Sequence, residues 1–283
     1  MKPKLSLLIG ILSISFAPIF VKFAVAAPVV AAFYRMLVAL LLLFPYCLIK
    51  GNLKAAQKPL LIALAGGVIF GADIAAWNIS LTLTSTTIST LIANLSPLWV
   101  GILSFLFLRQ NAGRLFWTGT LIALTGIVIL AGYQNVIALR LDAGILLALL
   151  SSLLYAFFIL MTKSVLKSIN SETFVFYNLV GATVFLFIIA CFQQNNLVSF
   201  STITWLCFLA LGIVCQLTGW LTITHALNYL PSTKVSMALL SRAVIASFWA
   251  FLLLHERIGL KEIIGSVLVL AGIAVTFINP AKA

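Results

Sequence analysis

Apolar stretches of about twenty residues recur from one end of this sequence to the other. A helix of about 20 apolar residues rises about 30 Å, the thickness of the hydrocarbon core of a bilayer. The predicted spans are Leu5–Ala26, Pro28–Ile49, Pro59–Ser80, Ser85–Leu108, Arg114–Tyr133, Ala143–Thr162, Glu172–Phe192, Ile203–Thr224, Pro231–Leu254 and Leu260–Ile278. Only 8% of the residues are charged, against about 25% in a soluble domain. The sequence therefore predicts an all-α polytopic membrane protein with ten transmembrane helices.

The positions of Lys and Arg predict the orientation of these spans. With a cytoplasmic N-terminus, ten Lys and Arg residues fall in cytoplasmic segments and three in outer segments. The ten are Lys2, Lys4, Lys50, Lys54, Lys58, Arg109, Arg114, Lys163, Lys167 and Lys282, and the three are Arg140, Arg257 and Lys261. This asymmetry predicts a multi-pass protein of the inner, or plasma, membrane with both termini cytoplasmic. The net charge of +12 is spread over short connections, so we expect no nucleic-acid partner.

The two halves of the sequence repeat one pattern. The matched residues are Gly113, Gly119 and Gly126 with Gly259, Gly265 and Gly272 at an offset of 146, Phe33-Tyr34-Arg35 with Phe176-Tyr177-Asn178, and Asp73 and Trp77 with Gln216 and Trp220 at an offset of 143. Each half holds five spans, and because five is odd the second half enters the membrane from the opposite side. We therefore expect two inverted five-helix repeats, residues 1–137 and 138–283, as in many secondary transporters.

Several segments also carry a family resemblance through their order. They are FAPIFVKFA (Phe16–Ala24), FYRMLVALLLL (Phe33–Leu43), DIAAWNISLTLTSTTISTLIANLSPLW (Asp73–Trp99), QLTGWLTITHALNYLPSTKVSMALL (Gln216–Leu240) and the endings GTLIALTGIVIL and GSVLVLAGIAVT. Nearly the whole chain resembles the EamA family of the drug/metabolite transporter superfamily. The resemblance implies ten helices in two inverted repeats around a central cavity, and usually the export of small metabolites. Two positions differ from the family pattern. Arg109-Gln110-Asn111 stands where the fourth span of similar sequences often ends in an acidic pair. Arg242 stands where family members more often carry Gln or Pro.

Charged residues inside the spans are the first candidates for a site. Arg242 lies near the middle of the ninth span, where a charge costs from about 2.5 to more than 10 kcal/mol, and a guanidinium does not lose its proton. Lys22, Arg35 and Arg242 outnumber the one carboxylate, Asp73, so we expect an anionic substrate group at Arg242. A structural Arg242 is the alternative. Asp73 and Arg35 lie at matched depth. In one interpretation they form a structural or coupling ion pair together with Lys22. In the other, Asp73 binds a substrate ammonium or a proton.

Uncharged residues complete the predicted substrate-binding set of Arg242, Asp73, Gln216, Asn94, Trp77 and Tyr155. Gln216 and Asn94 lie near the depth of Arg242 and can hydrogen-bond a carboxylate. Trp77 and Tyr155 could stack on a planar substrate, although most aromatic residues in membranes serve packing. No Cys/His cluster and no catalytic motif occurs in the sequence, so we expect no metal, no cofactor and no catalytic residue.

These features predict a secondary transporter that exports or exchanges a small organic metabolite, an amino acid or related carboxylate, by alternating access. One alternative is an uptake or exchange carrier for a nucleotide-like metabolite such as S-adenosylmethionine. An intramembrane transferase would need paired acid and base groups at one depth, and a channel would need a ring of pore residues. The expected partners are a small-molecule substrate and the lipid bilayer, with the protein a monomer or homodimer.

Overall fold

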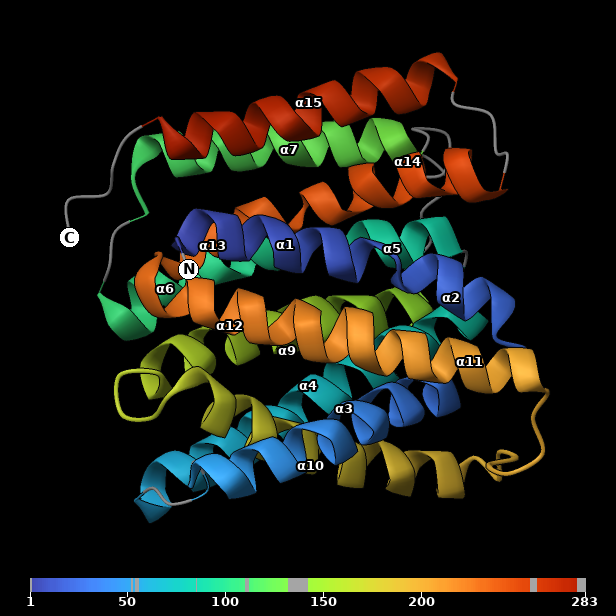
Figure 1. Cartoon of the computed structure of the whole chain (residues 1–283). Helices are drawn as coiled ribbons and strands as arrows, with labels where there is room; N and C mark the ends of the chain where they lie inside the picture. The colour runs from blue at the N-terminus through green and yellow to red at the C-terminus, as the bar shows by residue number, and fades with distance from the viewer. Residues whose placement is uncertain are drawn as a thin grey trace. The chain divides into compact units, whose positions relative to one another are not determined.

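The computed structural model of the chain describes residues 2–51, 53, 56–84, 86–109, 112–131, 142–254 and 259–278. Within these ranges every element of regular secondary structure is a helix (Figure 1). The elements are α1 (Pro3–Ser15), α2 (Ala17–Phe23), α3 (Pro28–Lys50), α4 (Gln57–Leu83), α5 (Thr86–Ala93), α6 (Ser96–Leu108), α7 (Arg114–Ala131), α9 (Ala143–Val165), α10 (Ser171–Phe192), α11 (Thr202–Ala210), the π-helix η1 (Leu211–Thr218), α12 (Gly219–Tyr229), α13 (Ser232–Leu239), α14 (Ser241–Leu254) and α15 (Leu260–Phe277).

The helices form membrane spans in the predicted order. Nine helical segments of the described chain are long and apolar enough to cross a membrane, and a tenth, Arg114–Leu130, is apolar but shorter. Large apolar side chains such as Leu41, Leu121 and Val184 are more than half exposed. A surface of this kind suits lipid rather than water, so the prediction of an all-α polytopic membrane protein is confirmed.

Several spans are discontinuous. The first divides at Phe16 and the fourth at Asn94 and Leu95, with Pro18 and Pro97 in the first turn of the following piece, as proline requires. The ninth span divides at Leu240, between α13 and α14. The predicted span Pro231–Leu254 is present as Ser232–Leu253, in two helical pieces. Leu240 stands at the repeat offset of 146 from Asn94, so the two breaks occupy equivalent positions.

Contacts divide the chain into two compact units. The first unit contains Met1–Ala75 and Met161–Tyr229, and the second contains Ala76–Leu160 and Leu230–Ala283. Each unit draws helices from both halves of the sequence. The predicted repeat boundary at 137/138 lies outside the described residues and stays a prediction.

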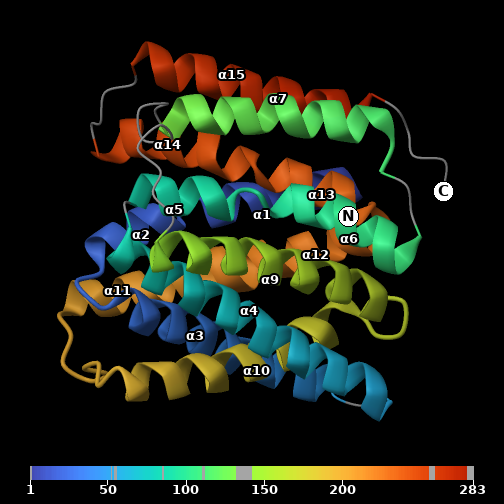
Figure 2. The same ribbon diagram turned by 180° about the vertical axis from the view of Figure 1, so that it is seen from behind.

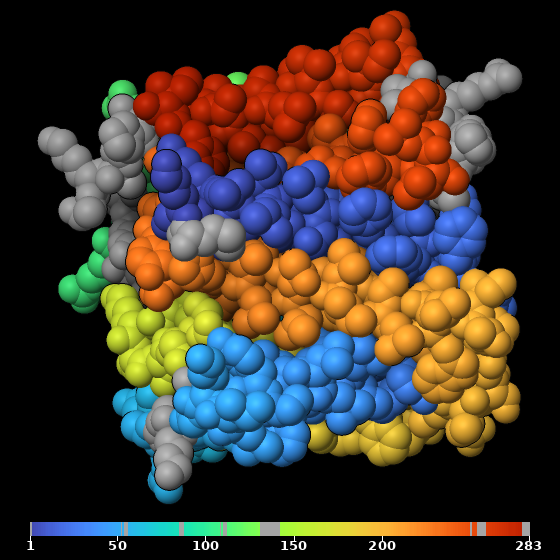
Figure 3. All heavy atoms as spheres, viewed as in Figure 1, coloured from blue at the N-terminus to red at the C-terminus, as the bar shows by residue number. Residues whose placement is uncertain are grey.

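In the first unit α1 packs closely along α12 (Figure 3, dark blue against orange). Gly10 permits this approach, because a Cβ there would lie 2.8 Å from the backbone oxygen of Gly219. Ser6 adds a hydrogen bond from its hydroxyl to the backbone oxygen of Thr222 at 2.7 Å. The α1–α12 contact therefore rests on small residues, as is usual where membrane helices approach closely.

Two tyrosines of the first unit show the repeat directly. The hydroxyl of Tyr34 in α3 donates to the backbone oxygen of Leu197, after α10, at 2.5 Å. The hydroxyl of Tyr177 in α10 donates to the backbone oxygen of Leu53, after α3, at 2.9 Å. Each tyrosine thus binds the connection that follows the helix of the other, which is the pattern a two-fold relation produces.

In the second unit α7 and α15 lie side by side (Figures 1 and 2). A Cβ on Gly119 would lie 2.5 Å from the oxygen of Gly272, and one on Gly126 would lie 2.6 Å from the oxygen of Gly265. The residue numbers rise along α7 as they fall along α15, so the two helices are antiparallel. Because Gly119 matches Gly265 and Gly126 matches Gly272 in the repeat, the contact is reciprocal, as inverted repeats require.

Candidate functional site

Arg35 and Gln216 form a direct contact in the first unit. The Nε of Arg35, in α3, donates to Oε1 of Gln216 at 2.8 Å. Gln216 lies in η1 and is 1% exposed. The amide satisfies one guanidinium hydrogen but contributes no negative charge. The sequence grouped Gln216 with Arg242 by depth, and its hydrogen-bond partner is Arg35.

The π-helical turn explains how Gln216 reaches α3. A π-helix widens the backbone by one residue per turn and redirects the side chains that follow. Gly212, in the same segment, brings the backbones together, since a Cβ there would lie 2.5 Å from the Cβ of Val38 and 3.3 Å from the oxygen of Arg35. The sequence predicted an ordinary α-helix over these residues, because the amino-acid composition of η1 does not distinguish a π-helix from an α-helix.

Asp73 and Lys22, the other charged candidates of this unit, differ in burial. Asp73 lies in α4 and is 7% exposed. Lys22 lies in the last turn of α2 and its side chain is exposed, which differs from the expectation of a buried cation. The predicted coupling of Asp73 with Arg35 stays a prediction.

Arg242 and Tyr155 meet in the second unit. The guanidinium carbon of Arg242 lies 5.5 Å from the ring centroid of Tyr155, which is 6% exposed in α9. Arg242 is the second residue of α14, directly after the break at Leu240. In the part of the chain that the structure describes, its guanidinium makes no hydrogen bond and no ion pair. A cation–π contact is worth about 2 kcal/mol when desolvated, and it leaves the net charge in place.

Asn94 and Trp77 also belong to the second unit. Asn94, at the break before α6, is 4% exposed and donates from Nδ2 to the backbone oxygen of Thr90 at 2.8 Å. The same carbonyl accepts the backbone N–H of Asn94 at 3.1 Å, so the side chain adds a second hydrogen bond at the end of α5. The indole nitrogen of Trp77 is buried and has no hydrogen-bond partner among the described residues. Trp77 therefore has an unused donor, whereas Asn94 has a structural role.

Two other polar side chains inside the spans, those of Lys163 and Trp99, have structural partners. Lys163 donates from Nζ to the backbone oxygens of Leu227 and Asn228, at 2.8 and 3.0 Å, and so caps the carboxyl end of α12. The indole nitrogen of Trp99 donates to the hydroxyl of Ser152 at 2.9 Å. Neither side chain is a candidate for substrate binding.

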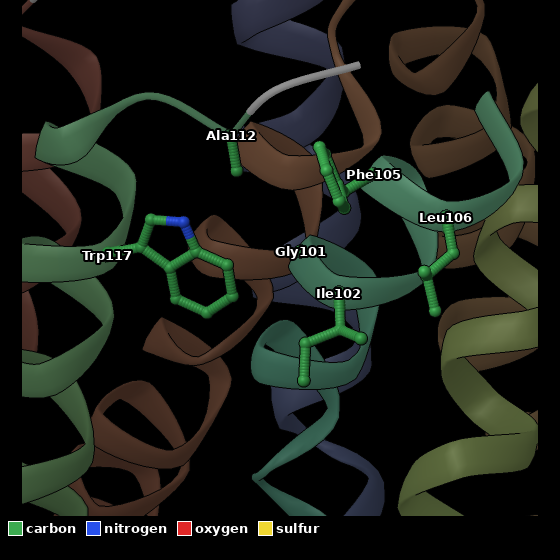
Figure 4. A pocket seen from close by; sticks show the side chains of 6 residues that line it. All are labelled: Gly101, Ile102, Phe105, Leu106, Ala112 and Trp117. Carbon is green, nitrogen blue, oxygen red and sulfur yellow. The ribbon is translucent and has the colours of Figure 1, made fainter. Parts of the chain in front are cut away.

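The second unit also contains a hollow of about 330 Å³ between the end of α6 and the start of α7. Figure 4 shows the Trp117 side chain from α7 on one side and residues of α6 on the other. The lining residues are Gly101, Ile102, Phe105, Leu106, Ala112 and Trp117. None of them is charged and none belongs to the predicted site.

The predicted substrate-binding residues thus divide between the units. Asp73 and Gln216 belong to the first, and Arg242, Asn94, Trp77 and Tyr155 belong to the second. Within the units the structure pairs Gln216 with Arg35 and Tyr155 with Arg242. Neither pairing was predicted from the sequence, because the spacing of polar and apolar residues along a span does not show which spans pack against each other.

Comparisons with known proteins agree with this architecture. The profile of the EamA-like transporter family matches residues 1–132 and 142–278, nearly the whole chain in two copies. The uncharacterized transporter YdfC of Bacillus subtilis (strain 168) is 20% identical over 281 residues, 98% of this chain and 90% of that protein. An uncharacterized transporter of Archaeoglobus fulgidus is 26% identical over 257 residues, 87% of each chain.

A solved crystal structure supports the fold. It matches with a TM-score of 0.82 at 17% identity and covers 98% of this chain and 97% of its own. Identity this low shows a shared fold and nothing about substrate.

Proposed function

The chain belongs to the EamA-like transporter family, and we propose that it exports or exchanges a small carboxylate-bearing metabolite by alternating access. The protein is then a secondary transporter in which Arg242 binds the anionic group of the substrate. The family and its relatives make it a multi-pass membrane transporter, and the substrate class is inferred from the chemistry of the second unit.

The observation that carries the proposal is the charge of Arg242 together with its contacts. Its guanidinium stays charged at every physiological pH, and its guanidinium carbon lies 5.5 Å from the ring centroid of Tyr155. A carboxylate can accept two parallel hydrogen bonds from the fork of a guanidinium. An anionic substrate would therefore supply the hydrogen bonds and the negative charge that the described part of the chain does not give this residue.

The broken ninth span supports the same assignment. α14 begins directly after the break, and the positive end of its helix dipole favours an anion. Arg242 belongs to the first turn of α14. Discontinuous helices of this kind commonly form the substrate sites of secondary transporters.

The test is counterflow in liposomes, which assumes no driving ion, with a panel of amino acids and other carboxylate metabolites. We expect one of them to show saturable exchange. Arg242→Gln should fold and lose on the order of tenfold or more in apparent affinity, since a charged bidentate contact is worth more than about 1.4 kcal/mol. Arg242→Lys should transport weakly, because it keeps the charge without the fork.

The matched control is Lys234→Gln, a cation of the same span whose Nζ lies 5.4 Å from the ring centroid of Phe277. It should keep the wild-type affinity. Wild-type apparent affinity in folded Arg242→Gln would show that Arg242 is structural, and a substrate class without an anionic group would refute the proposal.

A further inference from the structure

The hollow at the end of α6 has an apolar lining, and the helix ends next to it carry arginines. Phe105 and Leu106 on its α6 side are 57% and 62% exposed, so the hollow opens on the outside of the second unit. Gly101 forms part of its floor, where a Cβ would lie 2.5 Å from the ring of Phe116. An open apolar hollow in a membrane-spanning helix pair faces acyl chains.

Two arginines stand at the same end of these helices. Arg109 follows the last residue of α6 and Arg114 begins α7, and both are exposed. Each is three residues from a lining residue, Leu106 or Trp117, which is about one helical turn or 5 Å along the axis. No Asp or Glu occurs in the sequence from Gly101 to Trp117. The ends of the two helices that line the hollow therefore carry two exposed arginines, and this segment contributes no acid.

Arg109 occupies a backbone position that usually belongs to glycine. Its φ of 51° is left-handed, and it caps α6 by donating its N–H to the oxygen of Ser104. Glycine is preferred at this position because a Cβ there is strained. An arginine at this place is consistent with a use for its side chain outside the helix.

We propose that the end of α6 binds an anionic phospholipid, with one acyl chain in the hollow and the headgroup phosphate at Arg109 and Arg114. The apolar lining accepts a chain, and burial of each CH₂ group favours binding. A phosphate takes bidentate hydrogen bonds from guanidinium. Trp117, one turn into α7, has the amphipathic side chain that is enriched at the headgroup level. None of its residues belongs to the transport site proposed at Arg242.

The test uses the full chain in bilayers with brominated lipids, which quench tryptophan fluorescence on contact. Brominated phosphatidylglycerol and brominated phosphatidylcholine are compared, and the signal of Trp117 is the difference between wild type and Trp117→Phe. We expect the Trp117 signal to be quenched at a severalfold lower mole fraction of phosphatidylglycerol. Equal quenching by the two lipids would overturn the proposal.

Variants separate the two halves of the site. Arg109→Gln and Arg114→Gln should each reduce the preference for phosphatidylglycerol and leave quenching by phosphatidylcholine unchanged. Ile102→Phe, which narrows the hollow, should weaken quenching by both lipids. Lys167→Gln, an exposed cation of the first unit, is the control and should change neither.

Inorganic phosphate is the competing occupant of the arginines. If inorganic phosphate abolishes the preference for phosphatidylglycerol while Ile102→Phe has no effect, the arginines bind free phosphate and the lipid site is refuted. A preference that survives both arginine substitutions would equally refute the assigned headgroup contact.

Discussion

Arg35 donates its Nε hydrogen to Oε1 of Gln216 at 2.8 Å, across the contact between α3 and η1. The acceptor is neutral, so the bond fixes the direction of the guanidinium without cancelling its charge. The repeat offset of 143 makes Arg35 equivalent to Asn178 and Asp73 equivalent to Gln216. Each equivalent pair has one charged and one neutral member. The two charged residues, Arg35 and Asp73, lie in different spans of the first repeat. The first unit is therefore symmetric in backbone and asymmetric in charge.

Gln216→Leu is expected to destabilise the protein by about 1 to 2 kcal/mol, because it leaves a guanidinium hydrogen without its acceptor. Thermal unfolding in detergent measures this loss. The control is Asn178→Leu, at the position equivalent to Arg35, because Nδ2 of Asn178 is buried with no hydrogen-bond partner among the described residues. Its replacement should be close to neutral. Equal losses in the two variants would show that the Arg35–Gln216 bond contributes nothing.

Asp73→Asn and Arg35→Gln should each reduce counterflow, and the double variant should be no worse than the more harmful single one. The reason is that an interacting pair is lost once, whichever member is removed. A double-mutant cycle on folded protein measures the interaction. Fully additive losses would establish that the two residues act independently.

Tyr155→Phe should retain the substrate affinity of the wild type, whereas Tyr155→Leu should lower it severalfold. A phenyl ring keeps the face on which Arg242 stacks, and leucine keeps only bulk. Counterflow together with thermal unfolding separates the effects, since a purely structural Tyr155 would lower stability without changing affinity. If Tyr155→Phe loses affinity as Tyr155→Leu does, the hydroxyl rather than the ring is required.

Gly119→Ala is expected to destabilise the α7–α15 contact by about 1 to 3 kcal/mol, because the added Cβ meets backbone that cannot rotate away. Gly113→Ala is the control, since nothing lies within 4 Å of a Cβ at Gly113. It should be neutral in the same unfolding assay. A neutral Gly119→Ala would mean that the two helices separate easily.

Reporter fusions test the orientation. Fusions after Ala283 should report the cytoplasm, and fusions at Asn135 should report the outer side, because ten of thirteen Lys and Arg residues in the connections and termini fall on the predicted inner side. An outer signal at Ala283 would contradict the even number of spans.

The sequence predicted the spans well because length and hydropathy decide membrane insertion, and both are local properties. Two of the breaks have a local cause in the sequence, because Pro18 and Pro97 stand just after them and proline removes a backbone donor. The sequence did not predict the break at Leu240, where no proline stands, although the repeat offset from Asn94 points to it. The sequence also did not predict the π-helix η1, because one extra residue in a helical turn changes the spacing of the apolar residues too little to be recognised.

The candidate site could be predicted only in part. The sequence identified Arg242 as a costly charge but not Tyr155 as its contact, because that pairing depends on how α9 and α14 pack. Burial of Lys22 was expected from its place in a span, yet the short helix α2 leaves its side chain exposed. Which spans lie side by side is a tertiary property, and hydropathy does not encode it.

The reciprocal contact between Gly119 and Gly272, and between Gly126 and Gly265, has a consequence for the origin of the fold. An isologous contact joins two copies of one surface, so it requires only one sequence to form. A single five-helix chain able to insert in either direction would make this contact with a neighbour facing the opposite way. The α7–α15 pair is thus the interface of an antiparallel homodimer held within one polypeptide, and it needed no new surface when the two halves were fused.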